Sequence, residues 1–163
     1  ALLAISATPR KGGNSEQVLN SFAGGASTAG RETETIRLND LNFRLARHAG
    51  SAPLQENAFS KMFIDRFQCW WYAKYRLKKP FIPNDGKKYA FFISVGALKK
   101  KEQYQSAEDA VDVFFHIANF QRKGSLLFGG YDEKGSISRD PQNLQKAFQA
   151  GFDFATSLRR DRD

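Results

Sequence analysis

The chain has 163 residues, of which 41% are hydrophobic and 26% charged, which predicts one domain over residues 1–163. No apolar run is long enough to cross a bilayer, and the single cysteine excludes an internal disulfide or an all-cysteine metal site built from this chain alone. The net charge of +8 is scattered, so we expect neither nucleic acid nor a membrane as partner. The lone cysteine and the lack of a visible secretory signal suit a cytoplasmic location.

The first half of the chain alternates between strand and helix patterns. Residues 1–5 are an apolar run that predicts a strand buried on both faces. Helical spacing of Val18, Phe22 and Ala26 then predicts a helix from Ser15 to about Gly30. Residues 33–38 alternate and predict a second strand, and apolar and aromatic residues predict a long helix over about 56–76.

The second half continues the alternation. It predicts an apolar strand at 89–95, an amphipathic helix at 107–118, a short strand at 126–128 and a last helix at about 141–158. Asp140-Pro141 is a typical helix start, a cap followed by proline at the first helical position. The alternation predicts an α/β fold with a parallel sheet.

Residues 39–55 do not fit this scheme. A parallel crossover needs a dozen or more residues before its returning strand, and this segment is too short for both. Either the sheet has only four strands, or one or more segments are missing from the sequence between about 44 and 59. We favour the second explanation, which predicts that consecutive Cα atoms between Arg44 and Phe59 are not all about 3.8 Å apart.

The segment SATPRKGGNSE, residues 6–16, follows the first predicted strand, where ligands bind in open α/β sheets. A helix start offers unpaired N–H groups to an anion, and Gly12 and Gly13 let the backbone turn inward. Polar donors for a phosphate are Thr8, Arg10, Asn14 and Ser15. The alternative is a plain turn capped by Asn14 or Ser15. Because both a P-loop lysine motif and Gly-x-Gly-x-x-Gly are absent, we expect a single phosphate, as in a mononucleotide.

Residues 5–19, ISATPRKGGNSEQVL, resemble the Gly-Ser-Pro-Arg-x-x-Gly-Asn-Ser/Thr opening of the NADPH-dependent FMN reductase and iron–sulfur flavoprotein family. Ala7 and Thr8 stand where that pattern has Gly and Ser. SAPL at 51–54, SKMFIDRFQCWW at 60–71 and FFISVGA at 91–97 resemble further family segments. The resemblance implies a flavodoxin-like three-layer sandwich with strand order 2-1-3-4-5, if a missing segment supplies strand 3.

The resemblance also implies a cofactor site. Thr8, Arg10, Asn14 and Ser15 would hold the FMN phosphate, and Lys11 would add charge or be simply solvated. Pro53 and Leu54 would line the isoalloxazine ring. Backbone groups of Ser94, Val95 and Gly96 would approach its polar edge, unless they form only a strand-to-loop turn. Independently of the resemblance, Tyr131 follows Gly129-Gly130 at the end of the last predicted strand, where it would reach this site or that of a neighbouring molecule, or be a surface aromatic.

The implied function is an FMN-binding oxidoreductase that uses NAD(P)H as co-substrate and serves a small-molecule or protein electron acceptor. No catalytic side chain and no metal ligand are assigned, and the sequence supports no iron–sulfur cluster, although related proteins carry cluster cysteines in the segment that this chain lacks. An electron-transfer flavoprotein served by a redox partner is one alternative, and a flavin-free phosphate or nucleic-acid binder is another. The aromatic helix around Trp70 is too crowded for one buried face, so we expect a homo-oligomer, a dimer or tetramer, through it.

Overall fold

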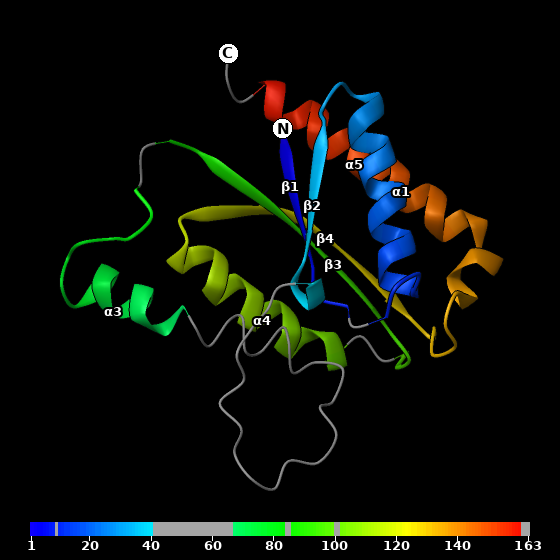
Figure 1. Cartoon of the computed structure of the whole chain (residues 1–163), viewed down its shortest axis with the longest axis horizontal. Helices are drawn as coiled ribbons and strands as arrows, with labels where there is room; N and C mark the ends of the chain where they lie inside the picture. Colours follow the sequence, from blue (N-terminus) through cyan, green and yellow to red (C-terminus); the bar gives the residue numbers. More distant parts are fainter. Residues whose placement is uncertain (9, 41–66, 84–85, 100–101, 161–163) are drawn as a thin grey trace, which may run out of the picture.

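The computed structural model describes residues 1–8, 10–40, 67–83, 86–99 and 102–160 (Figure 1). The strands are β1 (Leu2–Ser6), β2 (Thr33–Arg37), β3 (Lys88–Gly96) and β4 (Phe120–Gly129). The helices are α1 (Asn14–Thr28), α3 (Gln68–Tyr75), α4 (Glu102–Ile117) and α5 (Pro141–Arg160), with short 3-10 helices at Leu38–Asp40 and Ser136–Arg139. The expected break between Arg44 and Phe59, and residues 56–66 of the expected long helix, lie outside the described residues.

The strands form two parallel pairs. β1 pairs with β2 from Leu2 opposite Thr33 to Ser6 opposite Arg37. β3 pairs with β4 from Lys88 opposite Phe120 to Gly96 opposite Gly129. Parallel strands with helices between them confirm the predicted α/β class. The predicted strand order, with a further strand between the two pairs, stays a prediction.

Helices cover both faces of the β3–β4 pair. α1 and α5 pack together on one face, and α4 lies on the other with α3 beside it (Figure 1). The core on the α1–α5 side contains Val18, Phe128, Ile137 and Ala147, with Ile93 and Leu126 packed against it. Across the sheet, Arg122 and Ser125 of β4 bond to Glu108 of α4 at 2.6 and 2.7 Å. The register shift in the β3–β4 ladder adds a residue to β4 between these two, so both can face α4.

Glycines allow α1 and α5 to approach closely. A Cβ on Gly25 would lie 1.9 Å from the carbonyl oxygen of Phe148, and one on Gly151 would lie 1.9 Å from that of Phe22. Backbone therefore touches backbone at this crossing, and no side chain fits between the two helices. This contact fixes the second half of α1 against α5.

Two strand predictions need correction. β1 was expected to be buried on both faces, but the side chains of Leu3 and Ile5 are 58% and 43% exposed. The described elements cover only its other face, where Leu2 packs against Ala26 and Ala155. β4 begins at Phe120 rather than near Leu126. Its first half is polar because Arg122 pairs with acidic residues of α4, so the apolar pattern missed it. Within the described residues, no helix is long and apolar enough to span a membrane.

Candidate functional site

The carboxyl ends of β1, β3 and β4 surround a small hollow of about 100 Å³. Three segments that are far apart in the sequence line it: the loop into α1, the end of β3, and the loop after β4. Its lining residues are Thr8, Arg10, Gly13, Asn14, Ser15, Val95, Gly96, Ala97, Tyr131, Asp132 and Lys134. This is the edge of a parallel sheet where ligands are expected.

The loop before α1 is shaped by its glycines. Gly12 has a φ of 70°, in the left-handed region that favours glycine. Gly13 is the N-cap of α1 and makes no side-chain cap, since it has no side chain. Its carbonyl oxygen accepts bonds from the N–H groups of Glu16 and Gln17, both at 3.1 Å. Among the described contacts the N–H groups of Asn14 and Ser15 have no partner, so the helix start offers two donors to the hollow.

A cluster of charged residues contacts this loop. The Gly12 N–H donates to the carboxylate of Glu16, which also forms an ion pair with Arg37 at the end of β2. Arg37 neutralises Glu16, so the carboxylate in the first turn of α1 repels an incoming anion less. Asp40 lies 3.6 Å from Arg37 Nε and 3.5 Å from Lys11 Nζ. The side chain of Lys11 is 76% exposed and does not line the hollow.

The buried side chain of Asn14 has a structural role rather than a ligand-binding one. Its Nδ2 lies 2.8 Å from the carbonyl oxygen of Glu133 and 3.3 Å from that of Tyr131. Its Oδ1 accepts a bond from the Ile137 N–H at 3.1 Å. Asn14 therefore ties the start of α1 to the loop after β4, and its backbone N–H is the group left for an anion.

Tyr131 joins the loop after β4 to β3 and α5. Its N–H donates to the Gly96 carbonyl at 3.0 Å, and its hydroxyl donates to Asp140 Oδ2 at 2.9 Å. Asn143 Nδ2 donates to the Tyr131 hydroxyl oxygen at 2.6 Å. Burial, and then the bond to Asp140, raise the pKa of Tyr131. The phenol therefore stays protonated and holds the wall of the hollow in place at neutral pH.

The loop after β3 is braced by Tyr104 of α4, whose hydroxyl donates to the Leu98 carbonyl at 2.6 Å. A Cβ on Gly96 would lie 3.0 Å from the same hydroxyl, so a larger residue there would disturb this brace. Burial raises the pKa of Tyr104, which keeps its proton available for the bond.

The structure brings together most of the residues predicted for the site. Thr8, Arg10, Asn14, Ser15, Val95 and Gly96 line the hollow, whereas Lys11 and Ser94 do not. Pro53 and Leu54 lie outside the described residues. Sequence reasoning missed Asp132 and Lys134. The signal for them was Gly129-Gly130 at the end of β4. Ligands bind beyond the carboxyl ends of parallel strands, and this rule applies to β4 as it does to β1.

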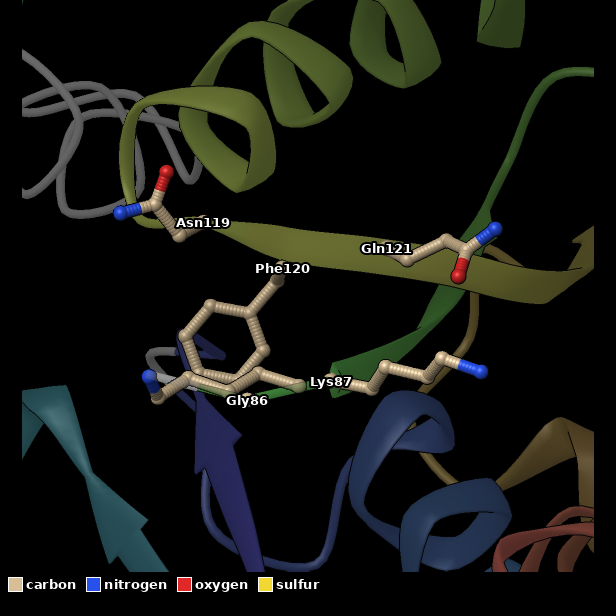
Figure 2. Close-up of a pocket in the computed structure, with 6 residues that line it drawn as sticks. Gly86, Lys87, Asn119, Phe120 and Gln121 are labelled. Atoms are coloured by element: carbon tan, nitrogen blue, oxygen red, sulfur yellow. The ribbon is translucent and has the colours of Figure 1, made fainter. Parts of the chain in front are cut away.

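A larger hollow of about 350 Å³ lies at the opposite, amino end of β3 and β4 (Figure 2). Gly86, Lys87, Lys88, Asn119, Phe120 and Gln121 line it. Polar groups here already serve the local structure: Asn119 Nδ2 donates to the Ile82 carbonyl at 2.7 Å, and Lys88 Nζ donates to that of Pro83 at 2.8 Å. None of its lining residues lies at the start of a described helix, so the smaller hollow has the better chemistry for an anion. Among the described residues, no group of three or more His, Cys, Asp or Glu side chains could hold a metal ion.

Comparison with known proteins relates the fold to flavodoxin-like reductases. No family model and no curated protein sequence matches the chain. A flavone reductase has a TM-score of 0.60 at 16% identity over 97% of this chain, which spans 62% of that protein. The NAD(P)H:quinone oxidoreductase from Methanothermobacter marburgensis has a TM-score of 0.54 at 20% identity, over 94% of this chain and 98% of that one. At these identities the likeness shows the fold, which is α/β and flavodoxin-like.

Proposed function

We propose that this chain is an FMN-binding oxidoreductase that takes a hydride from NAD(P)H and passes electrons to an acceptor. The observation that carries the proposal is the convergence of three strand ends on one hollow, which is lined by a helix start, by Thr8 and Ser15 with their hydroxyls, and by the cationic residues Arg10 and Lys134. The names of the two similar structures, both reductases, support the oxidoreductase class. FMN and the kind of acceptor come from the family resemblance.

The described residues suit the phosphate end of FMN. Thr8 and Ser15, which carry hydroxyls, and Arg10, which carries a guanidinium, line the hollow beside the first turn of α1. Lys134 adds a second cation, and the carboxylate of Asp132 is also present in the lining. A Cβ on Gly13 would lie 3.1 Å from the Arg10 carbonyl oxygen, so glycine keeps this turn tight. At about 100 Å³ the hollow can take one end of a cofactor, since whole ligand pockets measure about 300 Å³ or more.

The roles of the chain's own residues follow from this placement. The N–H groups of Asn14 and Ser15 and the side chains of Thr8 and Arg10 would bind the phosphate. The segment Val95–Ala97 would approach the flavin through backbone groups at the end of β3. FMN itself supplies the redox chemistry when bound, and the protein supplies position and electrostatics.

The test is titration of the purified protein with FMN, followed by visible absorbance and flavin fluorescence. The wild type should bind FMN, and anaerobic NADPH should then bleach the flavin. Thr8→Val should weaken FMN binding by about 10- to 100-fold, the usual value of a hydrogen bond to a charged group.

Thr28→Val is the matched control, because the Thr28 hydroxyl bonds the Gly24 carbonyl at 2.9 Å in the last turn of α1, far from the hollow. Its FMN affinity should equal that of the wild type. If the wild type binds no FMN, the proposal fails. If FMN binds but NADPH does not bleach it, the protein is an electron-transfer flavoprotein rather than a reductase.

A further inference from the structure

A basic, aromatic surface lies on α3 and the loop that follows it. Its apolar members are all exposed: the side chains of Trp71, Tyr72, Leu77 and Phe81 are 45%, 54%, 55% and 69% accessible. We call these four residues, together with the exposed cations Arg76, Lys78, Lys79 and Lys87, the α3 surface. In Figure 1, α3 stands at the edge of the molecule, away from α1 and α5.

Charge on this surface has one sign. The described residues 67–83 and 86–88 include six lysines or arginines and no Asp or Glu. Two of the six make hydrogen bonds within the molecule: Lys74 Nζ donates to Asn119 Oδ1 at 2.6 Å, and Lys88 Nζ donates to the Pro83 carbonyl at 2.8 Å. The other four belong to the α3 surface and form no ion pair within the described part of the chain.

Aromatic packing holds the surface in a fixed shape. Trp70 stacks on Phe81 with ring centroids 4.7 Å apart and an interplanar angle of 18°. Phe67 packs edge-on against both Trp70 and Phe114 of α4, at 4.2 and 4.6 Å. Phe81 is therefore held against Trp70 before any contact, and this part of the α3 surface needs little ordering on binding.

We propose that the α3 surface binds an anionic lipid bilayer peripherally. Trp and Tyr side chains favour the membrane interface, and each lysine or arginine near an anionic leaflet adds about 1 kcal/mol of attraction. α3 has 8 residues, so it would lie on the bilayer rather than cross it. The sequence, which lacks a long apolar run, predicted no membrane contact, but an interfacial surface does not need such a run.

Three observations favour a lipid surface over other partners. Exposed Leu77 and Phe81 suit a deformable apolar layer better than a nucleic acid, and three of the four exposed cations of the α3 surface are lysines rather than planar arginines. A two-fold dimer through this face would bring like charges together. An electron acceptor docked here would be remote from the candidate site, because nine-residue β3 separates the two by about 25 Å.

The inference is independent of the proposed cofactor, so its test uses the protein with and without FMN. Of the two tryptophans of the chain, Trp71 belongs to the α3 surface and Trp70 stacks on its Phe81, so tryptophan emission reports contacts of this surface. The probes are vesicles of phosphatidylcholine alone or mixed with phosphatidylserine. With the mixed vesicles we expect co-sedimentation, blue-shifted tryptophan emission and protection of that emission from a soluble quencher.

Paired variants distinguish an effect of the α3 surface from an effect of the net charge of the chain. Lys78→Gln with Lys79→Gln should weaken binding to the mixed vesicles about 25-fold, at about fivefold per lysine. Arg139→Gln with Lys146→Gln removes the same charge from exposed positions near α5 and should change binding less than twofold. Leu77→Asn should reduce both binding and the blue shift. Far-UV circular dichroism should be unchanged in every variant.

Five outcomes would overturn the inference. The first four are no binding to the mixed vesicles, equal losses in the two double variants, binding without a change in tryptophan emission, and tighter binding to single-stranded RNA than to the vesicles. The last outcome is a blue shift that appears without vesicles as the protein concentration rises, together with a doubled molecular mass that Leu77→Asn abolishes. That result would make the α3 surface a subunit interface and would also overturn the inference.

Discussion

Asn14 accepts a hydrogen bond from the N–H of Ile137 at 3.1 Å, although 123 residues separate the two in the chain. The same amide reaches the carbonyl of Glu133 at 2.8 Å through its Nδ2. One side chain thus holds the first loop of the candidate site against the last. These hydrogen bonds explain why Asn14, which the sequence predicted as a phosphate ligand, has a structural role here.

Replacement of Asn14 by alanine should destabilise the protein by about 2–3 kcal/mol, because it removes the partner of one buried N–H group and of two part-buried carbonyl groups. Urea unfolding measures this loss. The control is Asn20→Ala at an exposed position of the same helix, which should be neutral or slightly stabilising. Equal effects at the two positions would show that the link between the loops contributes nothing.

Gly151 should not tolerate alanine. Its Cβ would lie 1.9 Å from the Phe22 carbonyl oxygen, so α1 and α5 would have to separate. We expect a loss of about 1–3 kcal/mol or more in the free energy of unfolding. Gly24→Ala is the matched case, because its Cβ would meet only the Phe148 ring at 3.7 Å. That variant should be neutral or up to about 1 kcal/mol more stable, and a similar loss in both would refute the close contact.

Tyr131 should make stability fall at alkaline pH. Its folded pKa is raised above the ordinary value of 10.0, so the folded chain keeps a proton that the unfolded chain has lost. The contribution is complete below pH 10 and is lost as the pH rises through the raised pKa. Between about pH 8 and pH 11, the urea midpoint of Tyr131→Phe should fall less steeply than that of the wild type. Parallel slopes would show that this phenol is not the group concerned.

Lys134, rather than Lys11, should strengthen binding of a phosphorylated ligand. Lys134 lines the hollow, whereas Lys11 lies 3.5 Å from Asp40 and outside the lining. Lys134→Gln should weaken FMN binding severalfold, and Lys11→Gln should leave it nearly unchanged, as measured by fluorescence titration. The two variants remove the same charge, so equal losses would mean that only the general field of the loop matters.

Local pattern predicted much of the fold. Residues 89–95 and the Asp140-Pro141 start gave β3 and α5 almost to the residue, because apolar runs and cap chemistry are local signals. Long-range contacts gave no such signal. The first half of β4 is polar because Arg122 forms ion pairs with Glu108 and Asp112 of α4. The site divides in the same way. The loop from Thr8 to Ser15 could be found from its sequence, but the role of Asn14 depends on Glu133 and Ile137, which only the fold brings near.

The central claim is that the loop between β1 and α1 binds the phosphate of FMN. Comparison of FMN with riboflavin, which lacks that phosphate, tests it most directly in the wild type and in Arg10→Ala. We predict that the wild type prefers FMN about 10- to 100-fold, that Arg10→Ala loses most of this preference, and that riboflavin affinity stays the same. Equal affinity of the wild type for FMN and riboflavin, or no binding of either, would contradict it.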